Sequence, residues 1–513
     1  MADTGTTVLD TMSKEVNDLF RKGLELGHET GKQSCPTGLC STHGAKLMYK
    51  EITKKEAAVL RRMLSTGPLV RTLSVLNISL FAFRVAFYEL EECPSLKKVY
   101  IHVDCNGKDL GTSLTAAFRC LRTLELSCEN TGTGFAKDVA DYIRQNKSLR
   151  EIVIWDSCGG DEGAATLVEA LAANDTLKTF SLAEVELSSD ILIGFAKMLA
   201  TNSTLEVVNL KHVCPVEKDK VCWLTAQKRY AGVFKRLDIL WPEELLSELA
   251  ALIRRHACCP ALFISVTSSI EEGVLGEFSD ALAKAATLRS LDIESDIAVV
   301  NALHDRFDAD GTASALRKRE LHQIWGDMGA NRGKERHLVR ILDALKTNCS
   351  IEQFTTGAVM VTPEMATSLS ELLAVNDTLN VVHLYNYWEI SSNEIQTILK
   401  GLRANYTLTE LRVLWDCDHY EEMGEVNALL QRNVRLANKA AHFVVSGADV
   451  NDEEGADALK RLKSSARLVE EVKELTGKTT EAALGEIQST LARLTVCENM
   501  EDTSTWSAPH RYR

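Results

Sequence analysis

Four side chains near the amino terminus have the chemistry of a zinc site: His28, Cys35, Cys40 and His43. Thiolates and imidazoles are the usual ligands of tetrahedral zinc. Their spacing matches no common zinc finger, and such residues in one polar loop are more often unrelated surface and packing residues. We therefore predict no metal and no cofactor, and the sequence leaves zinc at this loop as an open alternative.

Motifs for nucleotide binding and catalysis are incomplete. Gly477-Lys478-Thr479 offers only the end of a P-loop, because Val472 stands where its first glycine belongs and a helical stretch precedes it. The acids before Gly311 resemble a calcium loop, but Arg306 occupies the first ligand position. The sequence contains neither a G-x-S-x-G elbow nor an H-E-x-x-H motif. We expect a protein that is not an enzyme and binds no nucleotide.

The third possible activity is recognition of another protein. The candidate residues for it lie between the apolar residues of short segments. Side chains alternate along a strand, so these positions point away from the core and toward an open face. Exposed Trp, Tyr and Arg dominate interface energetics, although a strand Trp can also pack against the adjacent repeat. The predicted partner-binding residues are Tyr100, His102, Arg150, Trp155, Trp325, His383, Tyr385, Arg412 and Trp415.

The apolar neighbours of these candidates recur with a fixed period. Leu121, Leu149, Leu177 and Leu205 are spaced by 28 residues, and each opens an L-x-x-L-x-L-like segment. Further segments of this kind begin at Val70, Leu96, Phe234, Ala261, Leu288, Leu321, Ile351, Leu379 and Leu408. The pattern predicts about thirteen repeats, each with one strand.

A helix is predicted in the second half of each repeat, where apolar residues such as Leu167 and Leu171 are four apart. An Asn then stands three residues before the next repeat's first apolar residue, as Asn174 does before Leu177. We predict a left-handed helix end at this Asn. Six of the seven N-x-S/T sequons fall at this position, so we interpret them as turn chemistry and not as glycosylation sites.

Units this small cannot bury their apolar faces alone, so they must stack. The predicted fold is an α/β leucine-rich-repeat solenoid, a horseshoe with a parallel inner sheet, outer helices and a concave face open to a protein partner. The 28-residue period and segments such as 160–171 resemble the ribonuclease-inhibitor type of leucine-rich repeat over residues 66–435. The chain also resembles NLR family CARD-domain-like proteins in its repeats and helical ends, although neither a NACHT domain nor a CARD is evident. Cys105, Cys158, Cys214 and Cys417 are expected to face the interior bend.

The ends lack the repeat. Residues 1–65 are predicted to form an amino-terminal helical cap with two helices around a polar loop, and residues 436–497 a carboxyl-terminal helical cap that includes a helix starting at Asn451. Residues 498–513 are expected to be a disordered tail. Longer repeats place extra chain at 308–312 and 327–334, where loop growth is the simpler interpretation and partner binding the other.

Composition narrows the partners and the compartment. The chain of 513 residues carries a formal charge of −14, which disfavours broad binding to nucleic acid or anionic lipid. We expect no membrane contact and a cytoplasmic location, because no signal segment or apolar span is visible, and reduced cysteines.

Three functions remain compatible with the sequence. The favoured one is a protein-binding scaffold or recognition protein, possible settings being innate immune or stress signalling, as the resemblance implies. The alternatives are an inhibitor of a basic ribonuclease-like enzyme and a GTPase-activating protein for a small GTPase, since both classes use this repeat.

Overall fold

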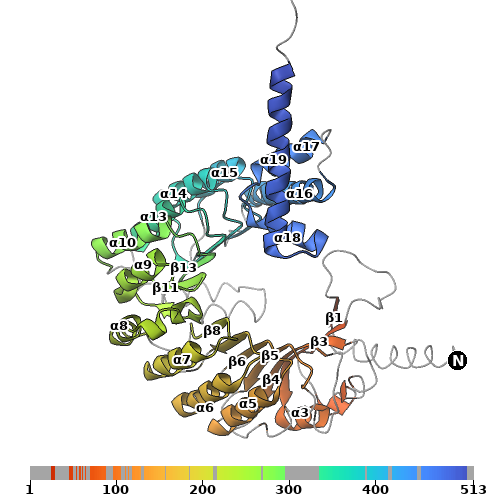
Figure 1. Cartoon of the computed structure of the whole chain (residues 1–513), viewed down its shortest axis with the longest axis vertical. Helices are drawn as coiled ribbons and strands as arrows, with labels where there is room; N and C mark the ends of the chain where they lie inside the picture. Colours follow the sequence, from red (N-terminus) through yellow and green to blue (C-terminus); the bar gives the residue numbers. More distant parts are fainter. Residues whose placement is uncertain are drawn as a thin grey trace, which may run out of the picture. The chain divides into compact units, whose positions relative to one another are not determined.

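The computed structural model describes residues 70–294 and 334–504, both with short gaps, and parts of the segment 25–64. The chain divides into two compact units near residue 240, and each unit is built around one sheet (Figure 1). Among the described helices, none is long and apolar enough to cross a membrane.

The sheet of the first unit has nine strands in sequence order. They are β1 (Glu25–His28), β2 (Ala45–Tyr49), β3 (Val70–Ser79), β4 (Lys98–Asp104), β5 (Thr123–Cys128), β6 (Glu151–Trp155), β7 (Thr179–Ala183), β8 (Val207–Asn209) and β9 (Leu237–Asp238). All neighbouring pairs from β2 onward are parallel, and β1 is antiparallel to β2. The described helices of this unit are α3 (Leu80–Phe87), α5 (Thr133–Gln145), α6 (Gly160–Ala173), α7 (Asp190–Thr201), α8 (Lys218–Thr225), η1 (Lys228–Tyr230) and η2 (Val233–Lys235).

The second unit repeats this plan with a sheet of six strands in sequence order. They are β10 (Leu240–Trp241), β11 (Ala261–Ser265), β12 (Ser290–Glu294), β13 (Gln353–Val359), β14 (Val381–Asn386) and β15 (Glu410–Val413). The strands from β11 to β15 are parallel. The helices beside them are η3 (Glu243–Leu245), α9 (Leu246–Arg254), α10 (Glu272–Ala283), α13 (Lys334–Leu345), α14 (Pro363–Val375) and α15 (Ser392–Ala404).

The core lies between each sheet and its helices. In β5 and β6 every second side chain is buried and the others are half-buried, which is the period of a strand with one covered face. The four leucines spaced by 28 residues are each only 1% exposed. Helices α5, α6 and α7 lie side by side along one side of the first sheet (Figure 1). The predicted α/β architecture with a parallel sheet built from repeated units is therefore confirmed, and the horseshoe curvature stays a prediction.

The place predicted for one strand, between β12 and β13, is not available in the sheet. A strand was expected at Leu321 and Ile324, between β12 and β13. These two strands instead pair directly, with Ser290 opposite Gln353, and the main-chain oxygen of Arg289 accepts from the N–H of Glu352 at 2.8 Å. The sheet leaves no place for a strand between them, so the predicted strand position is wrong. Leu321 and Ile324 themselves lie outside the described residues. The residues between β12 and α13 lie outside the described part of the chain. They include the predicted extra loop at 308–312 and all of the one at 327–334 except Lys334, which begins α13.

The asparagines at the helix ends form a hydrogen-bonded ladder between repeats. The side-chain N–H of Asn202 donates to the main-chain oxygens of Leu171 (2.8 Å) and Asn174 (3.0 Å) in the preceding repeat. Its Oδ1 accepts from the main-chain N–H groups of Thr204 (2.8 Å) and Leu205 (2.9 Å). One buried side chain thus donates to two main-chain oxygens at the preceding helix end and starts the next turn.

This ladder corrects the prediction of left-handed helix ends. The φ angles of Asn146, Asn174, Asn202, Asn376 and Asn405 lie between −79° and −89°, in the extended region. Asn is required for its amide, which donates and accepts at once, and not for its tolerance of positive φ. A buried amide nitrogen with two hydrogen bonds is also unavailable to a glycan, as predicted for the sequons.

In each unit, an arginine follows the last asparagine of the ladder. No Asn stands at position 231, and the guanidinium of Arg236 donates instead to the oxygens of Leu199, Asn202 (2.6 Å) and Leu205 (3.0 Å). In the second unit, Arg432 donates to the oxygens of Leu402, Arg403 and Asn405. In each unit, the arginine donates the hydrogen bonds that the next asparagine side chain of the ladder would donate.

The amino-terminal segment differs from the predicted cap. Two strands, β1 and β2, occupy the region where a polar loop between helices was expected, and β2 hydrogen-bonds to β3 with Leu47 opposite Leu73. A paired β2 removes the open edge that β3 would otherwise present. The predicted first helix lies outside the described residues, whereas Leu60 and Leu64 of the second are helical and buried.

Four helices follow the last strand: α16 (Tyr420–Val445), α17 (Glu453–Arg461), α18 (Ala466–Thr476) and α19 (Thr480–Ser504). Their buried cluster includes Phe443, Leu459 and Val472, which supports a helical end. The boundary predicted at 435 falls inside α16. The N-cap of α17 is Asp452, whose side chain accepts from the N–H of Gly455 at 2.9 Å, and not the predicted Asn451. α19 continues to Ser504, into the segment predicted as a tail from 498 onward.

Candidate functional site

Three predicted residues, Tyr100, His102 and Trp155, come together on the first unit's sheet, on the face opposite the helices. His102 of β4, Ser127 of β5 and Trp155 of β6 are in register across neighbouring strands. Tyr100 lies one row along, opposite Glu125. We call the outward side chains of β4–β6 the first sheet face. The alternation of the strands brings these residues together as the sequence predicted, although most of them are half-buried.

The first sheet face is held by bonds between strands. The indole N–H of Trp155 donates to Oε1 of Glu125 at 2.9 Å. Burial raises the pKa of Glu125, the indole bond lowers it in part, and repulsion by Glu151 raises it further. Oγ of Ser127 lies 2.7 Å from Nδ1 of His102. The aromatic ring of Trp155 is therefore oriented by the sheet before any partner arrives.

A second group forms on the sheet of the second unit. His383 of β14 is opposite Arg412 of β15, and both contact Glu410. Oε1 of Glu410 lies 3.2 Å from Nε2 of His383 and accepts from Nε of Arg412 at 2.6 Å. The Arg412 side chain remains 62% exposed. We call the outward side chains of β13–β15 the second sheet face. Tyr385 belongs to β14 with its backbone opposite Gly357.

Arg150, another predicted site residue, is not on either sheet face. Arg150 precedes β6, and its Nη1 donates to the main-chain oxygens of Thr176 (3.0 Å) and Leu149 (3.2 Å), so it stabilises the turn between repeats. Trp325 and Trp415 lie outside the described residues. The direct pairing of β12 with β13 leaves no place between them for the strand on which Trp325 was predicted.

Several polar residues of these faces were absent from the predicted set. Glu410 links His383 to Arg412, and Ser127 contacts His102. Thr123 donates to Glu151 across the strands at 3.4 Å. All are at outward strand positions, so the alternation that singled out Trp155 also marks them. They were passed over because the prediction weighted aromatic and basic side chains.

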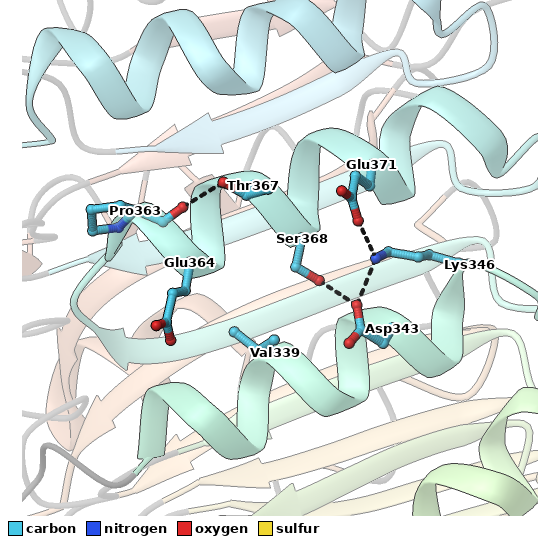
Figure 2. Close-up of a pocket in the computed structure, with 8 residues that line it drawn as sticks. All are labelled: Val339, Asp343, Lys346, Pro363, Glu364, Thr367, Ser368 and Glu371. Carbon is cyan, nitrogen blue, oxygen red and sulfur yellow. Dashed lines mark hydrogen bonds and ion pairs between the residues drawn. The ribbon is translucent and has the colours of Figure 1, made fainter.

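A shallow polar groove lies on the outer side of the second unit, between α13 and α14 (Figure 2). Nζ of Lys346 is 2.6 Å from Oδ1 of Asp343 and 2.7 Å from Oε2 of Glu371, and Ser368 donates to Asp343 at 2.8 Å. Burial by itself lowers the pKa of Lys346, but its two carboxylate partners outweigh burial and raise it. These polar groups are hydrogen-bonded to one another and join the two helices. Their presence in the groove is therefore explained by helix packing and needs no ligand.

The residues singled out for metal and thiol chemistry are placed in part. His28 is in β1, while Cys35, Cys40 and His43 lie outside the described residues. No group of three or more His, Cys, Asp or Glu side chains that could hold a metal ion occurs in the part of the chain that the structure describes. Cys105 and Cys158 are fully buried, and burial raises the pKa of Cys158 to about 11. Cys214 and Cys417 are outside the described ranges.

Repeat and sheet together define an α/β protein whose parallel sheets are built from repeated strand and helix units, an arrangement compatible with a solenoid. No protein-family model matches the chain. It is similar to Tropomodulin-4 of Bos taurus, with 29% identity over 114 residues, which covers 21% of this chain and 32% of that protein. It is similar to Tropomodulin-4 of Mus musculus at 29% identity over 111 residues, which covers 21% of this chain and 31% of the relative. The chain thus spans about a third of the length of these relatives.

Proposed function

We propose that this chain is a non-enzymatic scaffold of the cytosol that binds a protein partner through its two sheet faces. The observation that carries the proposal is the prepared arrangement on each face. Trp155 is oriented by Glu125, and Arg412 is positioned by Glu410 with most of its guanidinium exposed. Aromatic rings and guanidinium groups that are ordered before binding lose little entropy when a partner docks.

The repeat architecture and the similarity to Tropomodulin-4 support a protein-binding leucine-rich-repeat scaffold. Each repeat adds one strand and therefore one further row of outward side chains, so a partner can be recognised over many small contacts. The ribonuclease-inhibitor type of repeat and a role in innate immune signalling stay predictions from the resemblance, and no family model supports either one.

The experiment is affinity capture from native cytosol with the full chain as bait, followed by mass spectrometry and calorimetry on the captured protein. Trp155→Ala and Arg412→Ala serve as baits that lack one side chain on the first or second sheet face. Lys137→Gln, an exposed change on α5, is the matched control. The proposal expects a partner that the control retains and at least one face variant loses. A partner that all baits bind equally would place the interface elsewhere.

Two further assays separate the remaining functions. Tight inhibition in a titration against a pancreatic-type ribonuclease would favour the inhibitor, and faster GTP hydrolysis by a small GTPase would favour the activating protein. Inertness in both leaves the scaffold.

A further inference from the structure

The outer side of the first unit carries an exposed tryptophan. α8 buries Val221 and Leu224 and leaves Trp223 41% exposed. The ring centroid of Trp223 lies 5.6 Å from that of Tyr230, with the planes at 36°, and Tyr230 is only 2% exposed. One side of the indole is thus supported by a buried ring while much of the rest is open to solvent.

An arginine beside this tryptophan is held in place. Cζ of Arg229 lies 4.6 Å from the centroid of the Tyr230 ring, and its Nε donates to Oε1 of Gln227 at 3.1 Å. Gln227 in turn donates to the main-chain oxygen of Trp223 at 3.4 Å. Within the described residues, Nη1 and Nη2 of Arg229 have no hydrogen-bond partner. A fixed guanidinium with both terminal nitrogens available can receive a carboxylate with two hydrogen bonds.

The charge around these side chains is opposite to that of the whole protein. Residues 216–236 contain six basic and two acidic residues, in a chain of net charge −14. Lys220 is paired with Asp190, and Arg236 is bonded to main-chain oxygens. Lys228 is exposed and forms no ion pair with any described residue. The positive charges of Lys228 and Arg229 are therefore available to a ligand.

The size of this positive region selects the ligand. Charges are screened beyond about 8–10 Å in physiological salt, so a short acidic segment feels Arg229 and Lys228 more than the distant acidic surface. A long polyanion such as nucleic acid would extend past these two cations and meet a chain that repels it. The exposed indole adds apolar area that a purely ionic ligand would leave uncovered.

We propose that Trp223, Gln227, Lys228, Arg229 and Tyr230, named here the α8 patch, dock a short acidic segment of a partner protein. A carboxylate of that segment pairs with the two terminal nitrogens of Arg229, and an apolar side chain next to it packs on Trp223. The α8 patch is on the helix side of its unit (Figure 1), so this interaction is separate from binding at the sheet faces.

The test uses the full chain and a short fluorescein-labelled peptide in which Glu and Asp alternate with Leu and Phe, followed by fluorescence anisotropy. We expect saturable binding that weakens as salt is raised. Trp223→Ala should weaken the affinity about tenfold, because the apolar contact is lost. Arg229→Lys keeps the charge but loses the two-pronged geometry, and should weaken it about fivefold.

Matched controls separate this site from others. Lys137→Gln, which removes one positive charge on α5, and Trp155→Ala, on the first sheet face, should bind the peptide as the wild type does. Equal melting temperatures of Trp223→Ala and the wild type would show that this variant is folded. Arg229→Lys tests the same site through a different side chain. The proposal is overturned if both patch variants bind like wild type, or if a single-stranded oligonucleotide or vesicles of anionic lipid displace the peptide.

Discussion

The side-chain amide of Asn376 donates to the main-chain oxygen of Asn348, the residue at the same position one repeat earlier (3.0 Å). It also donates to the oxygen of Leu345 at 2.9 Å, while its Oδ1 accepts from the N–H groups of Thr378 and Leu379. Asn376 is only 6% exposed. A buried amide therefore makes four hydrogen bonds, two to the preceding repeat and two within the turn that follows it.

Asn376→Asp is expected to lower the free energy of unfolding by about 3–5 kcal/mol at neutral pH. The carboxylate keeps the acceptors but loses both donors, so a buried charge faces two carbonyl oxygens. Its folded pKa should be raised, because only the protonated form can donate. The loss should therefore be smallest below the ordinary carboxyl pKa of about 3.9 and grow as pH rises through the folded pKa. Chemical denaturation between acidic and neutral pH measures this.

The control for this variant is Asp377→Asn at the neighbouring exposed position, which changes a charge without touching the ladder. It should leave the unfolding midpoint nearly unchanged. A stability loss in Asn376→Asp that is independent of pH would contradict the proposed donation by the amide.

Arg236→Met is expected to cost about 2–4 kcal/mol, because the main-chain oxygens of Leu199, Asn202 and Leu205 lose this donor while the apolar stem is kept. Arg144→Met is the matched control, since Arg144 makes only an exposed ion pair with Asp141 at 2.8 Å, which contributes little. Urea denaturation followed by circular dichroism compares the two. Equal midpoints for both variants would show that Arg236 does not replace an amide rung.

The local spacing of apolar residues predicted the strands and helices well, because the leucines at 121, 149, 177 and 205 are each buried in the same way within their own repeat. It did not predict the direct pairing of β12 with β13, because strand pairing is decided by neighbours distant in sequence. Residues 321–324 match the local pattern, yet β12 and β13 satisfy each other's hydrogen bonds directly. The asparagine positions were found correctly, but their role depends on carbonyls of the preceding repeat, which no local pattern reveals.

The site was predictable only in part for a related reason. Alternation along a strand places Trp155 and His383 on an outward face, but it does not say what they contact. Glu125 and Glu410, which orient neighbouring side chains, lie on adjacent strands at distances set by sheet register. Arg236 and Arg432 lie off the repeat position whose role they take, so spacing alone did not indicate them.

Glu125→Gln is expected to make stability less dependent on pH. Burial and Glu151 raise the folded pKa of Glu125. A carboxyl with a raised folded pKa contributes stability below its unfolded pKa that is lost as pH rises through the folded pKa. Gln stays neutral and can still accept from Trp155, so the melting temperature of the variant relative to wild type should increase between about pH 4 and pH 7. Glu169→Gln, an exposed change on α6, controls for the loss of one negative charge. A relative melting temperature that falls over this range would reverse the sign and exclude the mechanism.

Trp155→Ala and Leu167→Ala should separate binding from folding. Trp155 is half-buried on the first sheet face, so truncation is expected to change the free energy of unfolding by no more than about 1–2 kcal/mol while weakening a partner by about 1–3 kcal/mol. Leu167 in α6 is fully buried, and its truncation leaves a cavity that should cost about 2–5 kcal/mol without altering the affinity of the molecules that remain folded.

Trp155→Phe keeps most of the ring but loses the bond to Glu125, and intermediate binding by this variant would show that orientation by Glu125 matters. Calorimetry measures the affinity of each variant for the captured partner, and denaturation measures its free energy of unfolding. A Trp155→Ala protein that is strongly destabilised but binds normally when folded would make Trp155 a structural residue.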